Sequence, residues 1–200
     1  NLSSPKTIAV FFLVISIVDN ALPISLAWAK KPSASTILIV FWVLKLSLVH
    51  LNLFLEKKRH SFLYFFIKCD ISDLKKVKKV FEDFKIDSVI NLAAESHVDK
   101  SIKNPLGFAQ TNVMGTLNLL EAARKQWKDD LTDKRFYHIS TDEVFGDVIK
   151  GRSKENWPYK PSSPYAASKA SSDHLVYSYV RTFKIPAMIT NCSNNYGPKQ

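Results

Sequence analysis

The sequence predicts an α/β fold in which a parallel sheet is doubly wound by right-handed crossover helices. Two observations support this prediction. From residue 70 onward, apolar runs of strand length alternate with longer segments whose apolar residues recur at helical spacing. The chain also has 200 residues, of which 46% are hydrophobic, and this is enough to bury one sizeable core.

The predicted elements follow one another in a regular order. The first is a helix over 73–86, whose apolar face comprises Leu74, Val77, Val80, Phe81 and Phe84. Residues 87–94 form a continuous apolar run, which is typical of a strand covered on both faces. The later elements are a helix over 112–127, a strand over 134–140, a helix over 163–183 that begins at a Ser-Pro signal, and a strand over 185–191.

Composition excludes several classes of function. The formal net charge is +10, but the lysine clusters at 57–59 and 75–79 are short, and the second lies on the polar face of a predicted helix. Nucleic-acid binding is therefore not favoured. Cys69 and Cys192 lie far apart and the five histidines are scattered, so we expect neither a disulfide framework nor a metal site.

The first third of the chain differs from the rest. The run 7–18, followed by Ala27, Trp28 and Ala29, loosely resembles a signal peptide, and the run 37–55 approaches the span of a bilayer. The second run contains Lys45, His50 and Asn52, and the remainder of the chain is typical of a cytoplasmic protein. We therefore favour buried strands over a membrane segment.

Polar residues gather where each predicted strand ends. The clusters are AAESH at 93–97, STDE at 140–143 and NCSNN at 191–195. Because ligands bind beyond the carboxyl ends of the strands in an open parallel sheet, we expect a site there. The adjacent carboxylates Asp142 and Glu143 also suit an ordinary surface turn, but at this edge they would reach a common ligand.

Tyr165 and Lys169 lie four residues apart on a predicted helix and therefore on one face. An ammonium beside a phenol stabilises the phenolate and lowers its pKa, so that the tyrosine acts as a base toward an alcohol. The spacing alone is weak, since Tyr64 and Lys68 share it. Tyr165 and Lys169 differ from that pair in their position, because they lie at the start of a predicted helix that follows the STDE cluster after one loop.

Five blocks of sequence resemble the extended short-chain dehydrogenase/reductase family, and within it the nucleotide-sugar 4,6-dehydratases that act on dTDP-glucose. The blocks are NLAAESHVDKSI, TNVMGTLNLLEAAR, FYHISTDEVFG, PSSPYAASKASSDHLV and TNCSNNYGP. The resemblance covers about residues 66–200. It implies a Rossmann-like sheet that is incomplete at its C-terminus, the cofactor NAD, and dehydration of dTDP-glucose to dTDP-4-keto-6-deoxyglucose on the route to rhamnose.

The resemblance also assigns chemistry to particular residues. Tyr165 takes the proton of the C4 hydroxyl while hydride passes to NAD, and Lys169 holds the ribose. Glu143 then removes the C5 proton, and Asp142 protonates the departing C6 hydroxyl. Such an elimination needs one carboxylate charged and the other protonated, which suits neighbouring carboxyls with separated pKa values. Thr141 completes the implied catalytic set.

Further positions match contacts of the same family. The implied cofactor contacts are Asp70, Ile71, Leu92, Ala93, Ala94, Thr111, Tyr165, Lys169 and Asn195. The implied substrate contacts are Ser96, Thr141 and Asn194. Tight packing alone would also explain Ala93 and Ala94. The resemblance further implies a homodimer that pairs through helices like those at 111–123 and 163–180.

Residues 1–65 depart from the family. No glycine precedes Gly107, so the glycine-rich phosphate turn is missing, and Cys69 stands where the family usually has glycine. We favour a frameshifted or wrongly assembled segment over a membrane-anchored fusion or a diverged nucleotide-binding half. The remaining alternatives are a catalytically inactive fragment, a membrane-associated derivative and another nucleotide-sugar epimerase or dehydratase. We expect no measurable dehydratase turnover from the 200-residue chain alone.

Overall fold

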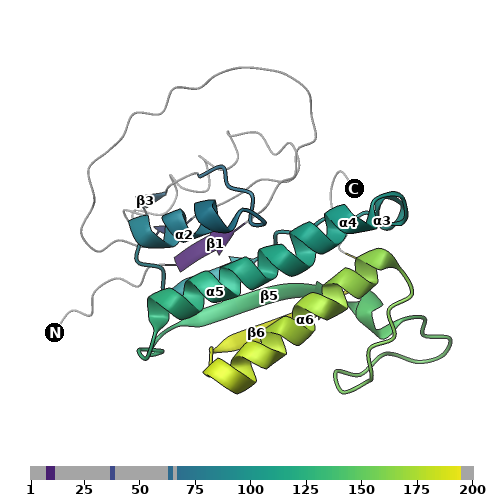
Figure 1. The fold of residues 1–200 in the computed structure, drawn as a ribbon. Coiled ribbons are helices and arrows are strands. Elements are labelled where there is room, and N and C mark those ends of the chain that lie inside the picture. The colour runs from purple at the N-terminus through teal and green to yellow at the C-terminus, as the bar shows by residue number, and fades with distance from the viewer. Residues whose placement is uncertain (1–7, 12–36, 39–62, 65–66, 195–200) are drawn as a thin grey trace, which may run out of the picture.

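The computed structural model describes residues 8–11, 37–38, 63–64 and 67–194, and within them four parallel strands form one sheet (Figure 1). Across this sheet the strands are, in order, β1 (Ile8–Phe11), β4 (Ser88–Asn91), β5 (Arg135–Thr141) and β6 (Ala187–Cys192). A second parallel pair is formed by β2 (Ile37–Leu38) and β3 (Leu63–Tyr64). The order β1-β4-β5-β6 is one part of the doubly wound order 3-2-1-4-5-6, so the predicted parallel α/β fold is confirmed.

The first predicted helix is α2 (Leu74–Asp83), which begins after the capping residue Asp73. The Asp73 carboxylate accepts hydrogen bonds from the backbone N–H groups of Lys75 and Lys76 at 3.1 and 3.2 Å, which satisfies two free donors of the first turn. Val77, Val80 and Phe81 are buried and Phe84 packs against the core, as predicted. Leu74, at the start of the same face, is 37% exposed.

The second predicted helix has an irregular beginning. α3 (Val98–Lys103) and α4 (Pro105–Phe108) lead into a π-helical turn, η1 (Ala109–Met114), before α5 (Gly115–Trp127) continues regularly. A Cβ atom at Gly115 would lie only 2.4 Å from Cδ1 of Ile71, so glycine lets α5 approach the segment before α2. Asn118 donates to the backbone oxygens of Ile71 and Ser72 at 2.9 Å each, which fixes that approach.

The third predicted helix is α6 (Pro164–Phe183), which starts at the Ser-Pro signal. The Ser163 hydroxyl accepts a hydrogen bond from the Ala166 N–H at 3.0 Å, and Pro164 occupies the first helical position, where no donor is needed. The helix ends at Lys184, whose φ of 59° is left-handed. Helices α2, α5 and α6 lie side by side along one face of the sheet (Figure 1).

The core lies between this helical layer and the sheet. Phe136 of β5 and Val89 of β4 are completely buried against the helical side chains of Leu119, Leu120 and Val176. The register pairs Val89 with Phe136 and Phe136 with Ala187, so the three strands stay level along their length. As a result β4, β5 and β6 all finish at the same side of the molecule, called here the strand-end edge.

Most of the first 65 residues fall outside the described ranges. Ile8–Phe11 of the first apolar run forms the strand β1, in agreement with the prediction of a strand for that short piece. The rest of the run 7–18 and nearly all of 37–55 lie outside the described residues. Among the helices that the structure describes, none combines the length and apolar character needed to cross a bilayer.

Candidate active site

The predicted polar clusters meet at the strand-end edge. Cluster 93–97 follows β4, cluster 140–143 spans the end of β5 and the start of the 3-10 helix after it, and Asn191 and Cys192 end β6. The side chain of Asn191 donates to the backbone oxygen of Thr141 at 3.2 Å, which ties β6 to the end of β5. Two substrate candidates, Ser96 and Asn194, are exposed at this edge, whereas Asn195 lies outside the described residues.

The adjacent carboxylates stand on a short 3-10 helix, η2 (Asp142–Phe145), that directly continues β5. The Thr141 hydroxyl oxygen accepts a hydrogen bond from the Glu143 N–H at 3.3 Å and therefore caps η2. The same hydroxyl lies 3.4 Å from Oδ1 of Asp142. Burial raises the pKa of Glu143, and the neighbouring Asp142 charge raises it further. A raised pKa makes Glu143 the stronger proton acceptor, as its implied role as a base requires.

Gly146 ends η2 in a conformation that favours glycine, with φ of 75°. A Cβ atom there would lie 2.3 Å from the backbone oxygen of Lys160, whose N–H in turn donates to the Val144 oxygen at 2.9 Å. The close approach of these two backbone segments holds η2, and with it the carboxylates, against the loop that precedes α6.

We expect Gly146→Ala to lower the free energy of unfolding by about 2 kcal/mol, since it adds a backbone clash to an unfavourable φ. Gly151→Ala is the matched control, because Gly151 has φ of 84° but no atom within 4 Å of its added Cβ. Urea unfolding of both variants checks the prediction. Equal losses in the two variants would show that the contact with Lys160 has no cost of its own.

Tyr165 lies in the first turn of α6, with 9% of its surface exposed. Its phenol is influenced by the Thr141 side chain, which acts to lower its pKa, and its ring meets Phe108 edge-on with centroids 6.3 Å apart. The structure raises the pKa of Tyr165, chiefly through burial, and the charges of Glu143, Asp142 and Asp173 add to this effect. The predicted lowering of the phenol pKa is therefore wrong for this chain, because burial and three carboxylates oppose the phenolate.

Lys169 lies one turn further along α6 and is buried, with 4% exposure. Its ammonium donates a hydrogen bond of 2.6 Å to the backbone oxygen of Ile139 in β5. Burial lowers the pKa of Lys169 to about 8, while Asp173 and then Cys192 counteract this shift. Tyr165 and Lys169 thus reach the end of β5 from one helix, as predicted, but the ammonium is directed to the strand backbone.

The cofactor candidates differ in how far they are exposed. Asp70 is exposed, and its carboxylate accepts the Ser72 N–H at 2.8 Å. Ile71 is only 2% exposed and belongs to the core cluster, so its side chain is engaged in packing. Of the other candidates, Leu92 is exposed, Ala94 is partly buried, and Ala93 and Thr111 are buried.

Asn112 is a buried polar residue that sequence analysis did not single out. Its carboxamide accepts the Glu95 N–H at 2.8 Å and donates to the Glu95 oxygen at 3.0 Å and to the Ser168 hydroxyl at 2.8 Å. Asn112 therefore ties the cluster after β4 to α6, within the π-helical turn η1. A polar residue in an apolar helical repeat was the available signal.

A second polar group that sequence analysis missed lies beneath the site. Asn91, His138 and Asp173 are at most 1% exposed and connect β4, β5 and α6. Tyr159, from the loop before α6, donates a hydrogen bond of 2.9 Å to Asp173. The spacing of these residues in the sequence carries no signal, because they belong to four different segments.

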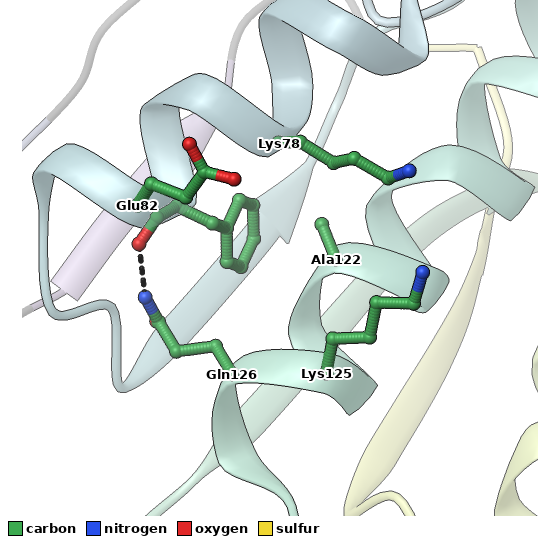
Figure 2. A pocket seen from close by; sticks show the side chains of 6 residues that line it. Lys78, Glu82, Ala122, Lys125 and Gln126 are labelled. Atoms are coloured by element: carbon green, nitrogen blue, oxygen red, sulfur yellow. Dashed lines mark hydrogen bonds between the residues drawn. The ribbon is translucent and has the colours of Figure 1, made fainter.

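A separate hollow of about 440 Å³ lies between α2 and α5. Figure 2 shows its lining, which comprises Lys78, Phe81, Glu82, Ala122, Lys125 and Gln126. Gln126 bridges the two helices by donating to the backbone oxygens of Phe81 and Phe84. The candidate residues of the strand-end edge do not line this hollow. Among the residues described, no three His, Cys, Asp or Glu side chains form a group suited to a metal.

Comparison with known proteins gives consistent relatives. dTDP-glucose 4,6-dehydratase of Neisseria meningitidis is 52% identical over 141 residues, covering 68% of this chain and 40% of the relative. The enzyme of the same name from Salmonella typhimurium is 50% identical over 149 residues, covering 68% of this chain and 41% of the relative. The chain thus spans about 40% of the length of these curated relatives.

Solved structures support the same relationship. The DesIV double mutant, a dTDP-glucose 4,6-dehydratase from Streptomyces venezuelae with NAD and DAU bound, superimposes with a TM-score of 0.66 at 35% identity, covering 85% of this chain and 49% of DesIV. UDP-glucose 4-epimerase from Thermus thermophilus, in complex with NAD, gives a TM-score of 0.61 at 32% identity, covering 72% of this chain and 45% of the epimerase. These neighbours support the predicted Rossmann-like fold.

The family match extends beyond the blocks that sequence analysis singled out. A family model described as GDP-mannose 4,6 dehydratase matches residues 46–200, which is more than half of the chain. The match begins inside the segment 1–65 that sequence analysis set apart as aberrant. Together with the parallel sheet and the strand-end residues, this match shows that the chain belongs to the GDP-mannose 4,6-dehydratase family.

Proposed function

We propose that residues 67–194 carry the catalytic groups of an NAD-dependent dTDP-glucose 4,6-dehydratase. The observation that carries this proposal is the grouping of Thr141, Asp142, Glu143 and Tyr165 at the end of β5. The Thr141 side chain and both neighbouring carboxylates influence the pKa of the Tyr165 phenol. A base for an alcohol therefore adjoins an acid pair suited to elimination.

The residues at this edge fit the nicotinamide half of a dinucleotide. Ala93 and Ala94 leave the backbone after β4 uncrowded by long side chains. Lys169 uses one hydrogen-bond donor on Ile139, so its ammonium keeps two donors for ribose hydroxyls. Asp70, Ile71, Leu92, Thr111, Tyr165 and Asn195 complete the proposed contacts. The sequence offers no glycine-rich turn for the pyrophosphate, since no glycine precedes Gly107.

The proposed mechanism assigns one proton transfer to each side chain. Tyr165 accepts the proton of the C4 hydroxyl, and Ser96, Thr141 and Asn194 orient the sugar. Bound NAD would supply the hydride chemistry, by accepting hydride from C4 and returning it to C6. Glu143 removes the C5 proton, which the C4 ketone acidifies, and Asp142 protonates the departing C6 hydroxyl. Water leaves, C5 takes up a proton from solvent in place of the one it lost, and the product is the 4-keto-6-deoxy sugar.

An acid pair distinguishes this proposal from the epimerase alternative. Exchange of configuration at C4 needs the Tyr165 base but has no use for Asp142 and Glu143. The raised pKa of Glu143 supports elimination, because it prepares one carboxylate of the pair to accept a proton. The missing glycine-rich turn favours a second candidate, a chain that keeps the catalytic groups but lacks activity by itself.

We also propose that the chain pairs as a homodimer through α5 and α6. Apolar and aromatic side chains on α6 support this proposal, since Tyr177, Val180 and Phe183 are 53%, 36% and 42% exposed. Exposed apolar surface of this kind is typical of protein interfaces.

A chimera tests the proposed function. Residues 67–194 replace the matching segment of the Salmonella typhimurium enzyme, which supplies the remaining parts of a full-length relative. We expect the chimera to convert dTDP-glucose into the 4-keto product, detected by its absorbance in alkali, whereas the 200-residue chain alone shows no turnover. A folded chimera that binds NAD without forming the ketone would contradict the catalytic assignment, and a C4 epimer as product would indicate the epimerase alternative.

A further inference from the structure

A continuous polar network lies beneath the candidate active site, within the interior of the molecule. It runs from Asn91 on β4 through His138 on β5 to Asp173 on α6, and each of these side chains is at most 1% exposed. Burying a charged carboxylate such as Asp173 costs free energy unless hydrogen bonds and an opposite charge compensate. The groups around Asp173 therefore have to compensate the cost of burying its carboxylate.

Three polar side chains surround the Asp173 carboxylate. Oδ2 accepts hydrogen bonds from the Ser140 hydroxyl at 2.7 Å and from the Tyr159 hydroxyl at 2.9 Å. Oδ1 lies 3.3 Å from Nε2 of His138, and neither of these two atoms has another hydrogen-bond partner in the described part of the chain. Their proximity makes each atom the natural partner of the other.

The network also determines which nitrogen of His138 carries the proton. The Asn91 side-chain oxygen accepts the Ala93 N–H at 3.1 Å, so the amide nitrogen of Asn91 is the group that lies 3.3 Å from Nδ1 of His138. That amide donates, which makes Nδ1 an acceptor and leaves the proton on Nε2. A neutral His138 therefore presents an N–H group to Asp173, and the imidazole adds no charge.

Lys169 is the cation of this buried group. It lies one helical turn before Asp173 on α6, and its ammonium donates to Ile139, which is flanked in β5 by His138 and Ser140. Asp173 is the largest of the electrostatic influences that oppose the effect of burial on Lys169, followed by Cys192 of β6. The other acids at this edge, Asp142 and Glu143 of η2, act electrostatically on Tyr165.

From this arrangement we propose that Asp173 is a positioning residue: it is the buried counter-charge that keeps the Lys169 ammonium charged and directed to the end of β5. His138, Ser140 and Tyr159 hold the Asp173 carboxylate in place. Tyr159 also joins the loop before α6 to this network, and its ring meets Phe145 of η2 edge-on at 5.3 Å. The network thus supports Lys169 and η2 together.

This inference deepens the proposed function, because it concerns the lysine assigned to the cofactor. Its test is a titration of Lys169 in the 200-residue chain, made with 13Cε-labelled lysine and followed by NMR. Loss of one resonance in Lys169→Met identifies the signal. We expect the wild-type pKa of Lys169 near 8, and a clear fall in Asp173→Asn, because only the smaller influence of Cys192 then opposes the effect of burial.

Two variants separate charge from general disruption. Tyr159→Phe removes one donor but keeps the carboxylate, so Lys169 stays protonated at pH 7. Asp147→Asn removes an exposed carboxylate from the same region and leaves the titration unchanged. An Asp173→Asn shift no larger than that of either control overturns the proposal. A wild-type Lys169 that titrates at the ordinary lysine value of 10.5 overturns it as well.

If Asp173→Asn does not fold, a measurement on the unaltered chain still tests the proposal. 15N NMR of His138 reports its tautomer, and we expect the proton on Nε2. A proton on Nδ1 instead would break the network and contradict the inference. None of these titrations needs NAD or sugar, so their failure leaves the dehydratase proposal standing, and an inactive chimera leaves the titration of Lys169 unaffected.

Discussion

Tyr165→Phe is expected to lower the turnover of the dehydratase chimera by about 10²–10⁴-fold. Phenylalanine keeps the ring that meets Phe108 but removes the hydroxyl that accepts the proton of the C4 hydroxyl. Without this base, C4 is not oxidised and the later elimination cannot begin. The measurement is formation of the 4-keto product at saturating dTDP-glucose, together with NAD binding.

Tyr177→Phe is the matched control for this variant. Tyr177 lies on the same helix but is 53% exposed, so loss of its hydroxyl leaves turnover unchanged. Binding of NAD by Tyr165→Phe must also stay close to that of the unaltered chimera, because the effect concerns the chemical step. Full turnover in Tyr165→Phe would show that Tyr165 is not the base.

The second expected result concerns stability at mildly acidic pH. Burial lowers the pKa of His138 from 6.5 to about 4, partly offset by Asp173. In the unfolded chain His138 takes up a proton near pH 6.5, whereas in the folded chain it stays neutral at that pH. The free energy of unfolding therefore has its full His138 contribution only above about pH 6.5. This contribution is lost as the pH falls toward 4, by about 3 kcal/mol in all.

Urea unfolding between pH 7.5 and pH 4 measures this loss. In His138→Asn the side chain no longer titrates, so the free energy of unfolding falls less steeply with acid than in the unaltered chain. His97→Asn is the control, because His97 is exposed and makes no side-chain cap bond to α3. Equal pH slopes in the unaltered chain and His138→Asn would show that His138 is not buried in its neutral form.

Local sequence pattern was sufficient for the regular elements of the second part of the chain. The apolar spacing of 73–86 predicted α2, and the Ser-Pro signal predicted the start of α6, because caps and amphipathic faces are short-range properties. The pattern did not indicate how deeply each residue of the apolar face is buried, since exposure depends on what packs against a residue; Leu74 is 37% exposed. It also gave no sign of the π-helical turn η1 before α5.

Part of the candidate site could likewise be predicted from the sequence, and part could not. That polar clusters end consecutive parallel strands is visible in the sequence, and so the meeting of Thr141, Asp142, Glu143 and Tyr165 could be predicted. The raised pKa of Tyr165 could not, because it depends on burial and on carboxylates contributed by two elements. The roles of the individual site residues remain predictions.

The amino-acid pattern by itself determined the α/β class, the order of helices and strands from residue 70 onward, and the edge of the sheet where polar residues gather. Only the tertiary structure decided how charges are paired inside the molecule. Asn91, His138, Tyr159 and Asp173 come from four separate segments, and their network exists only once β4, β5 and α6 are packed together. Periodicity arises between near neighbours along the chain, whereas burial and electrostatics arise between residues that folding brings together.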